Sequence, residues 1–442
     1  MYPYLVFRQL YNKTHIKQHY IEKVKRKSTA GLDKINSAKF EDCIKNNIGI
    51  INKKVLAGSY EFTNYKKLLI SKGENKTPRV ICIPTIRDKL VLSILNESLV
   101  KIFGDTVTIS PLPHSTINHM VTVINSGIYD AFVKIDISKF YGSINHNILI
   151  TKLKTKVHKK QILNLIQKAI ETPSIEVPRK NITALDKRDK GVPEGLSISN
   201  ALANIFLEDI DKKYKEISDI NYFRYVDDIV ILCSSTQLGY WSDMIKKDLI
   251  DLGLEINEKK DSGLLLVGFD YLGYKIGIPT ISVRESSVLK IEDSIEKVFS
   301  YYKYSKVPNI RYLEWRINLR VTGCIINGKK YGWIFFFSQI NDTYLLTHLD
   351  WLIQKIAMRY GVSDQIDCKK FKRTHYEVLF RLHNTKYIPN FDNYSIDQMR
   401  DILSRIYGRD LTGFNDKIID IEFKKIIKKE VHELEKDIQF MS

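Results

Sequence analysis

The sequence predicts an α+β protein, in which strands of an antiparallel sheet come before a helical C-terminal part. An apolar hairpin is expected at residues 222–233, YFRYVDDIVILC, and an alternating strand at residues 132–138, FVKIDIS. Long basic helices with interleaved tyrosines and tryptophans are expected after residue 284. At 442 residues the chain is long enough for about two to four packed subdomains.

The overall charge indicates the class of partner. The formal net charge is +18, the isoelectric point is near 9.3, and no apolar run is long enough to span a membrane. These properties favour a polyanionic partner, most simply nucleic acid, although a generally lysine-rich composition is the alternative. The five cysteines have no Cys-x-x-Cys spacing, which argues against a zinc module or a disulfide framework. With no apolar signal-peptide core at the N-terminus, we expect a cytoplasmic protein.

Two adjacent aspartates, Asp227 and Asp228, lie at the centre of the predicted hairpin, and we expect them to form its two-residue turn. Aspartates are common in exposed turns, so a surface hairpin is the simpler interpretation. The flanking residues 229–232 are, however, uniformly apolar and predict a strand against a core. Adjacent carboxylates near a core repel each other and lose hydration unless a cation neutralises them. The hairpin therefore predicts a divalent-metal site.

A third carboxylate is expected from the strand at residues 132–138. Asp136 falls on the face opposite the alternating Val133, Ile135 and Ile137. A single aspartate near a strand end is often only a helix cap, but together with Asp227 and Asp228 it would complete a two-metal site. Mg²⁺ prefers such oxygen ligands, and no cluster of histidines and cysteines in the sequence suggests zinc.

Two weaker signals come from other segments. Arg79 begins an expected strand at residues 79–84, on a hairpin with residues 65–70, and its planar guanidinium would suit phosphate oxygens. An exposed strand arginine explains it equally well. The glycine-bounded loop GVPEGLSISN at residues 191–200 could bring backbone close to a ligand. A plain turn with Ser197 or Ser199 as helix cap is the alternative.

The ordered set of motifs resembles the bacterial reverse transcriptases related to retrons and group II introns. The palm motifs are matched by FVKIDISKFYGSINH, GVPEGLSISNALANIFL, YFRYVDDIVIL, LGLEINEKK and FDYLGYKIG, and the fingers motifs by GLDKINSAKF and PRVICIPTIRDKLVLSIL. The resemblance covers about residues 28–280 and implies a right-hand polymerase fold. It implies an N-terminal region and fingers at 1–130, a palm at 131–283 with a fingers insertion at about 147–190, a helical thumb at 284–365 and a helical extension at 366–442.

The same resemblance assigns the catalytic metal site. It implies that Asp136, Asp227 and Asp228 are the catalytic carboxylates that bind two Mg²⁺ ions, with Mn²⁺ as an alternative. Ile137, the neighbour of Asp136, is included among the metal-binding positions.

The nucleotide pocket is assigned in the same way. Tyr141 would exclude a ribose 2′-OH, Arg79 would hold the incoming triphosphate, and Lys260 matches a lysine of the following motif. Residues 271–274 would approach the primer end. Glu194 departs from the family, which usually has glutamine there, and a carboxylate beside the nucleotide and template would be repulsive unless it is protonated or paired.

The resemblance implies an RNA-directed DNA polymerase that adds dNTPs to a primer 3′-OH and makes DNA on an RNA template. The tail containing YGWIFFFSQIND is most similar to stand-alone anti-phage reverse transcriptases, which implies a non-coding RNA partner. The alternatives are a template-independent or protein-primed polymerase, a retron enzyme, and an RNA-binding protein without catalysis. No membrane partner is expected, and both a homo-oligomer and a protein partner are left open.

Overall fold

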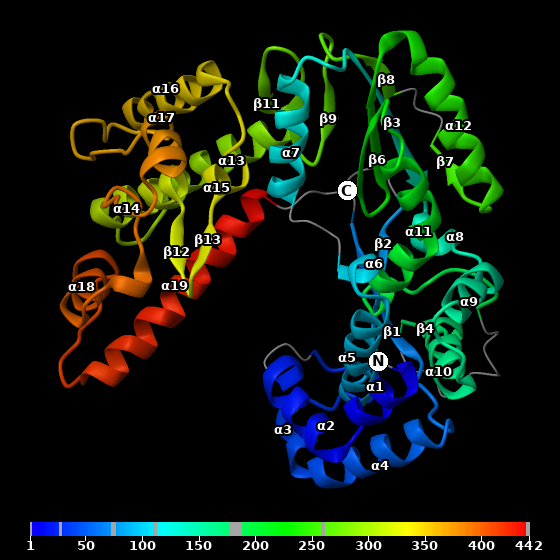
Figure 1. Ribbon diagram of the computed structural model, residues 1–442. Helices are drawn as coiled ribbons and strands as arrows, with labels where there is room; N and C mark the ends of the chain where they lie inside the picture. Colours follow the sequence, from blue (N-terminus) through cyan, green and yellow to red (C-terminus); the bar gives the residue numbers. More distant parts are fainter. Residues whose placement is uncertain are drawn as a thin grey trace. The chain divides into compact units, whose positions relative to one another are not determined.

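The computed structural model describes residues 2–25, 29–71, 77–108, 113–176, 188–257 and 261–438. The chain divides into two compact units, one formed by residues 1–112 and 127–263 and the other by residues 113–126 and 264–442. The first unit combines helices with two sheets, and the second is mainly helical (Figure 1).

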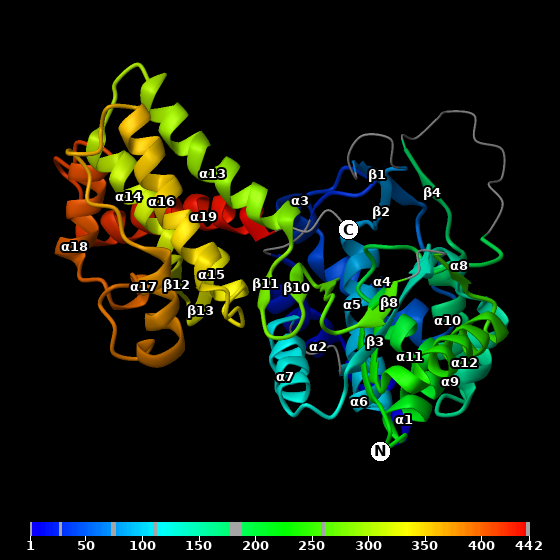
Figure 2. The ribbon, with the colours of Figure 1, turned by 90° about the horizontal axis from the view of Figure 1, so that it is seen from above.

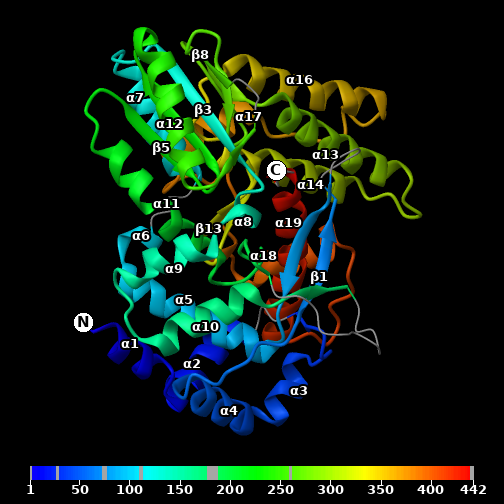
Figure 3. The same ribbon diagram turned by 90° about the vertical axis from the view of Figure 1, so that its right-hand side faces the viewer.

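Helix α5 (Ile86–Phe103) is the central helix of the N-terminal part of the first unit. Helices α1 (Pro3–Leu10), α2 (Lys13–His19) and α4 (Ile44–Leu56) all contact it (Figure 3). Thr85 caps α5 by accepting a hydrogen bond from the Asp88 backbone N–H. Most apolar side chains of α5 are fully buried, so this helix is a fixed support for the strands that precede it.

A small sheet lies directly before α5 in the chain. Strands β1 (Tyr65–Ile70) and β2 (Arg79–Ile83) form the expected antiparallel hairpin, and β4 (Ser174–Ile175) pairs in parallel with β1. Other described helical elements of the first unit are a π-helical turn at Tyr20–Val24, α3 (Ser37–Asp42), α6 (Asp105–Thr108), α8 (Phe140–Ser143), α9 (His146–Lys154), α10 (Lys160–Glu171) and a 3-10 turn at Ser235–Gln237, in addition to two helices that contact the main sheet.

The main sheet of the first unit has the strand order β5-β6-β3-β7, with β8 also paired to β3. Its strands are β3 (Ala131–Ser138), β5 (Asn221–Tyr225), β6 (Asp228–Cys233), β7 (Glu255–Ile256) and β8 (Asp261–Leu264). Helix α11 (Ser199–Lys215) contacts β5, and α12 (Leu238–Asp251) contacts β3 (Figure 3) as well as β6 and β7. The sheet is antiparallel at every pairing between β3, β5, β6 and β7, as the sequence predicts.

The alternation within β3 and β6 separates a core face from a polar face. Val133, Ile135 and Ile137 of β3 lie in the same core cluster as Ile229 and Ile231 of β6. Because successive strand residues point to opposite faces, Asp136 and Asp228 lie on the face away from this core. The hydrophobic pattern therefore fixes the face on which the acidic residues lie.

The second unit contains a three-stranded sheet of β9 (Phe269–Tyr271), β10 (Tyr274–Ile276) and β11 (Ile281–Val283), followed by helices. Helix α13 (Glu285–Lys303) contacts α14 (Ile310–Thr322), α16 (Thr343–Arg359) and α19 (Asp416–Ile438) (Figure 2). The other helical elements are α7 (Pro113–Asn125), α15 (Trp333–Phe336), α17 (Phe371–Tyr376), π-helical turns at Glu377–Arg381 and Ile402–Ile406, a 3-10 turn at Phe391–Asn393 and α18 (Ile396–Asp401).

One part of the second unit differs from the sequence-based expectation of long helices throughout. A hairpin of β12 (Cys324–Ile326) and β13 (Lys329–Tyr331) separates α14 from α15. The aromatic residues that follow pack inward, since Trp333 and Phe337 are buried. Within the described ranges, no helix is both long enough and apolar enough to cross a membrane.

Candidate active site

The tight turn of the aspartate hairpin consists of Val226 and Asp227, which corrects the expectation of an Asp227-Asp228 turn. Tyr225 pairs directly with Asp228, so Asp228 is the first residue of β6. Val226 adopts a φ of +59°, a left-handed conformation that β-branched residues rarely take. Such strain persists only where the surroundings hold it, and it therefore marks a constrained turn.

Arg224 supplies that constraint from within β5. Its Nη1 donates to the Val226 carbonyl at 3.0 Å, while its Nε and Nη2 donate to the Asp211 carboxylate of α11 at 2.7 and 2.5 Å. Asn204 of α11 accepts two further hydrogen bonds from Arg224, at 3.2 and 3.3 Å. The side chains of Arg224 and Asp211 are 7% and 16% exposed, so the pair is well shielded from solvent. This support was not predicted, although an arginine inside a buried strand was a signal that it needs a partner.

Asp136 and Asp228 are direct cross-strand partners in the β3–β6 register. Side chains of directly opposed residues lie about 4.5–5.5 Å apart at Cβ, so the two carboxylates are neighbours. Asn257 fixes Asp136 twice, because its Nδ2 donates to Asp136 Oδ2 at 2.6 Å and its backbone N–H donates to the Asp136 carbonyl at 3.0 Å. Asn257 lies in the predicted palm motif LGLEINEKK, but the sequence did not predict its contact with Asp136.

Asp227 joins this pair through the backbone. The Ile137 N–H donates to the Asp227 carbonyl at 3.4 Å, and the Ile137 side chain is buried in the core, so only its carbonyl oxygen could serve as a metal ligand. Burial raises the pKa of Asp227, and the negative charge of Asp136 raises it further. A half-buried carboxylate beside another carboxylate fits a cation-binding position.

The three aspartates are neighbours, but their carboxylate oxygens are not arranged around a single metal position. Within the described residues, the oxygens of Asp136, Asp227 and Asp228 do not form a group whose members all lie within 4.8 Å of one another. Rotation of at least one side chain would have to accompany joint binding of one ion.

Glu194 is paired, and its partner is Arg79. The Arg79 Nε donates to Glu194 Oε2 at 2.5 Å, and the Cys82 N–H donates to the Glu194 carbonyl at 2.7 Å. The loop can lie this close to β2 because residue 195 is a glycine. At Gly195, with φ +97°, a Cβ would come within 2.8 Å of Ile81 Cγ2 and 2.9 Å of the Cys82 carbonyl oxygen.

Tyr141 is held beside the same loop. The Val192 N–H donates to the Tyr141 carbonyl at 2.7 Å, and the Tyr141 side chain is half-buried. Burial raises the pKa of Tyr141 to about 12, with smaller contributions from the charges of Asp227 and Glu194. The structure therefore brings Arg79, Tyr141, Glu194 and Asp227 into one electrostatic environment.

The other expected positions behave differently. Lys260 lies outside the described residues. Tyr271 and Tyr274 are buried within the second unit, and the Tyr274 hydroxyl donates to the Phe336 carbonyl. Ser199 does not cap α11 with its side chain, because its hydroxyl donates to the Pro193 carbonyl at 2.6 Å.

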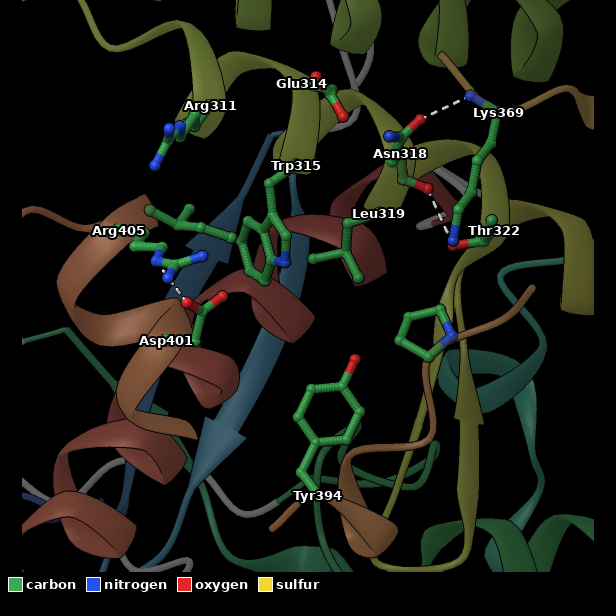
Figure 4. A pocket seen from close by; sticks show the side chains of 12 residues that line it. Arg311, Glu314, Trp315, Asn318, Leu319, Thr322, Lys369, Tyr394, Asp401 and Arg405 are labelled. Atoms are coloured by element: carbon green, nitrogen blue, oxygen red, sulfur yellow. Dashed lines mark hydrogen bonds and ion pairs between the residues drawn. The ribbon is translucent and has the colours of Figure 1, made fainter. Parts of the chain in front are cut away.

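The second unit contains a pocket of about 440 Å³, which none of the expected site residues line. Trp315 and Tyr394 form two of its walls, and Arg311 lies at one side (Figure 4). An ion pair between Arg405 and Asp401, with Nε and Oδ1 2.8 Å apart, lies at the same side. Apolar, aromatic and charged side chains line the pocket, and it shares no lining residue with the candidate active site.

Comparison with known proteins identifies the segment that contains the site. Residues 70–276 match the family model of the reverse transcriptase (RNA-dependent DNA polymerase). This segment is a reverse transcriptase domain. The match confirms the expected α+β right-hand polymerase fold and the expected enzyme class of the domain.

Two curated proteins are similar to parts of this chain. Protein YkfC of Escherichia coli (strain K12) is 22% identical over 198 residues, which cover 42% of this chain and 50% of that protein. The group II intron-encoded protein LtrA of Lactococcus lactis subsp. cremoris is 28% identical over 160 residues, which cover 35% of this chain and 26% of that protein. The chain thus matches half or less of the length of these relatives.

Among solved structures, telomerase from Candida albicans in complex with a fragment of telomeric RNA is 14% identical, with a TM-score of 0.41. The alignment covers 91% of this chain and 70% of that chain.

Proposed function

We propose that this protein is an RNA-directed DNA polymerase that adds dNTPs to a primer 3′-OH. The observation that carries the proposal is the direct pairing of Asp136 with Asp228, beside Asp227, within a reverse transcriptase domain. We assign residues 1–130 to the N-terminal region and fingers, 131–283 to the palm with a fingers insertion at about 147–190, 284–365 to the thumb and 366–442 to a helical extension.

The proposed metal site consists of Asp136, Asp227, Asp228 and the Ile137 carbonyl. Two Mg²⁺ ions held there would supply the charge that activates the primer hydroxyl and stabilises the departing pyrophosphate. The carboxylates suit this role because oxygen ligands are preferred by Mg²⁺, and because the raised pKa of Asp227 indicates an unfavourable charge that a cation would relieve. Arg224 and Asn257 would keep the turn and Asp136 oriented for these ligands.

The nucleotide would be selected by residues around the loop at 191–195. Arg79 would hold the triphosphate, and the ring of Tyr141 would occupy the volume that a ribose 2′-OH requires. Arg79 is bound to Glu194 in the structure, so the triphosphate would compete for the same guanidinium. Lys260 would contribute a further positive charge near the site.

The template is proposed to be RNA, with a non-coding RNA as its source and antiviral defence as its setting. The support is the resemblance of the segment YGWIFFFSQIND to stand-alone defence reverse transcriptases, together with the net charge of +18. An unpaired negative charge at Glu194 would have opposed templating and permitted template-independent synthesis. Because Arg79 neutralises Glu194, that charge no longer argues against templating.

Primer extension tests the proposal. The purified protein is given an RNA template, a DNA primer, dNTPs and Mg²⁺, and incorporation is compared for the native chain, the double variant D227N/D228N, and D219N. Asp219 is an exposed aspartate in the same domain, so D219N controls for loss of a surface carboxylate. We expect activity in the native chain and D219N and none in the double variant. Full incorporation by D227N/D228N would refute the site.

A second measurement separates templated from untemplated synthesis. Nucleic acid that copurifies with the protein is sequenced as RNA and as DNA. A defined RNA with complementary DNA supports the proposal, whereas DNA of low complexity without a complementary RNA contradicts templating but not polymerase chemistry.

A further inference from the structure

Two histidines and a glutamate from different helices converge in the N-terminal part of the first unit. His15 Nε2 lies 3.0 Å from Glu97 Oε2, and His19 Nδ1 lies 3.1 Å from the same oxygen. His15 and His19 are four residues apart on α2, so they share a helix face, and Glu97 faces them from α5. Among the described residues, only His15, His19 and Glu97 form a group of three His, Cys, Asp or Glu side chains whose ligand atoms all lie within 4.8 Å of one another.

The neighbours of these side chains are arranged as the outer shell of a metal site would be. The second nitrogen of His19, Nε2, lies 2.7 Å from the Ser93 hydroxyl, one turn before Glu97 on α5. A metal-ligating histidine usually donates its other N–H to such a group, which fixes the ring. Lys101 contacts Glu97 Oε1 at 3.0 Å and so leaves Oε2 to the two histidines.

We propose that His15, His19 and Glu97 bind one divalent transition-metal ion of the Zn²⁺ type. Ligand bonds of about 2.0–2.2 Å at tetrahedral angles separate ligand atoms by roughly 3.3 Å, and the two observed separations of 3.0 and 3.1 Å approach this value. Water would supply the fourth ligand, since His15 and Glu97 are each 27% exposed. Two imidazoles and one carboxylate select Zn²⁺, Co²⁺ or Ni²⁺ over Mg²⁺.

The ion would fasten α2 to α5 and would have no part in the polymerase chemistry. Helix α5 follows β2, which begins with Arg79, so the site would brace the support of that strand. The inference does not depend on the proposed function, because it rests only on the side chains of α2 and α5.

A hydrogen-bonded cluster without an ion is the competing explanation, and it requires different protons. There, His19 Nδ1 must carry a proton toward Glu97, and Nε2 must accept from the Ser93 hydroxyl. With an ion bound, Nδ1 has no proton and Nε2 donates to Ser93. The two states therefore contain opposite tautomers of His19, which ¹⁵N chemical shifts of the histidine ring distinguish.

The test measures uptake of Zn²⁺ and Co²⁺ by the full chain after treatment with a chelator, in excess Mg²⁺ to occupy the palm carboxylates. We expect about one ion per chain and, with Co²⁺, visible absorption typical of tetrahedral coordination. The variants H15A and E97Q should each weaken binding roughly tenfold or more. H348A is the matched control, because His348 pairs with Glu292 at 2.8 Å without a second histidine.

Two outcomes would overturn the proposal. One is absence of uptake by the native chain, with the His19 ring keeping its proton on Nδ1. The other is uptake by E97Q and H15A equal to that of the native chain. His19 is buried, so H19A could fail to fold. The test therefore uses H15A, because His15 is more exposed, and E97Q, because glutamine has nearly the same shape as glutamate. Far-UV circular dichroism of each variant checks the fold.

Discussion

Replacing Glu194 by glutamine should strengthen nucleotide binding. In the structure the Glu194 carboxylate accepts a hydrogen bond from Arg79 Nε at 2.5 Å. If Arg79 holds the triphosphate, the incoming phosphate oxygens compete with this carboxylate. Glutamine is nearly the same shape but uncharged, so E194Q weakens the competitor while leaving the loop backbone, anchored through the Cys82 N–H, unchanged.

The size of the expected change in KM follows from the solvent exposure of the Arg79–Glu194 ion pair. The side chains of Arg79 and Glu194 are 39% and 29% exposed, so solvent screens their attraction and the pair contributes up to about 1 kcal/mol. Since 1.4 kcal/mol corresponds to a factor of ten, loss of this competition should lower the KM for dNTP by up to about fivefold. The kcat should change little, because ground-state and transition-state binding of the triphosphate improve together.

Steady-state primer extension with varied dNTP measures this effect. The matched control is E176Q, because Glu176 forms an exposed ion pair with Lys67 of β1 at 3.2 Å, beside β2 in the same sheet. In an R79A background, E194Q should have no effect on KM, since the guanidinium is absent. A raised KM in E194Q would refute the reasoning and would mean that Glu194 orients Arg79 for the nucleotide.

Three further predictions concern the turn and the sugar. Y141A should reduce the preference for dNTPs over rNTPs by roughly 10–100-fold, because it removes the ring beside the sugar, as measured by the ratio of kcat/KM values. R224M should lower the free energy of unfolding by about 3 kcal/mol in denaturant titrations, because it leaves the shielded Asp211 carboxylate without its cationic partner and with only the hydrogen bond from the Tyr222 hydroxyl. D227N should abolish incorporation yet raise the Tm at pH 7 without divalent ions. The pKa of Asp227 is raised in the folded state, so above the ordinary aspartate pKa the folded protein binds more protons than the unfolded chain. The free energy of unfolding therefore falls as the pH rises from the unfolded to the folded pKa. Asparagine does not ionise, so D227N avoids this loss of stability.

Each of these predictions has a control. Y141F keeps the ring and should retain sugar discrimination, and a loss in Y141F equal to that in Y141A would contradict the steric role. R224K should still be destabilised, because lysine cannot make the bidentate contact with Asp211. For D227N, a Tm that is unchanged or lowered at pH 7 would contradict the unfavourable charge of Asp227.

The sequence was sufficient for the position of the carboxylates on the sheet but not for the turn between them. Alternation of apolar residues correctly predicted that Asp136 lies opposite the core face of β3. The observed turn lies one residue before the predicted one. The sequence did not predict Val226 in the turn, because Val226 is β-branched and a left-handed φ is unfavourable for it. Only the contacts of Arg224 with Asp211 and the Val226 carbonyl explain why this conformation is kept, and such contacts depend on tertiary packing.

The missed β12–β13 hairpin shows a local signal that was present in the sequence. Asn327 and Gly328 connect the two strands, with φ values of +51° and +67°. Asn-Gly is the characteristic pair of a two-residue hairpin turn, in which both residues have positive φ. The Asn-Gly pair was missed because the basic and aromatic residues on both sides of it predicted continuous helices. The Arg79–Glu194 pair, by contrast, joins residues 115 positions apart and has no local signature.

The charges gathered in the candidate site couple nucleotide entry to cation binding. Asp136, Asp227, Asp228 and Glu194 bring four carboxylates to the region, where the guanidinium of Arg79 is paired with Glu194 and that of Arg224 with Asp211. A triphosphate approaching these groups without a cation would meet a net negative charge, and its attraction to Arg79 would be opposed by the aspartates. With divalent cations at the aspartates the same region becomes attractive. Nucleotide affinity should therefore depend steeply on the concentration of divalent cations, and E194Q should reduce this dependence without removing it.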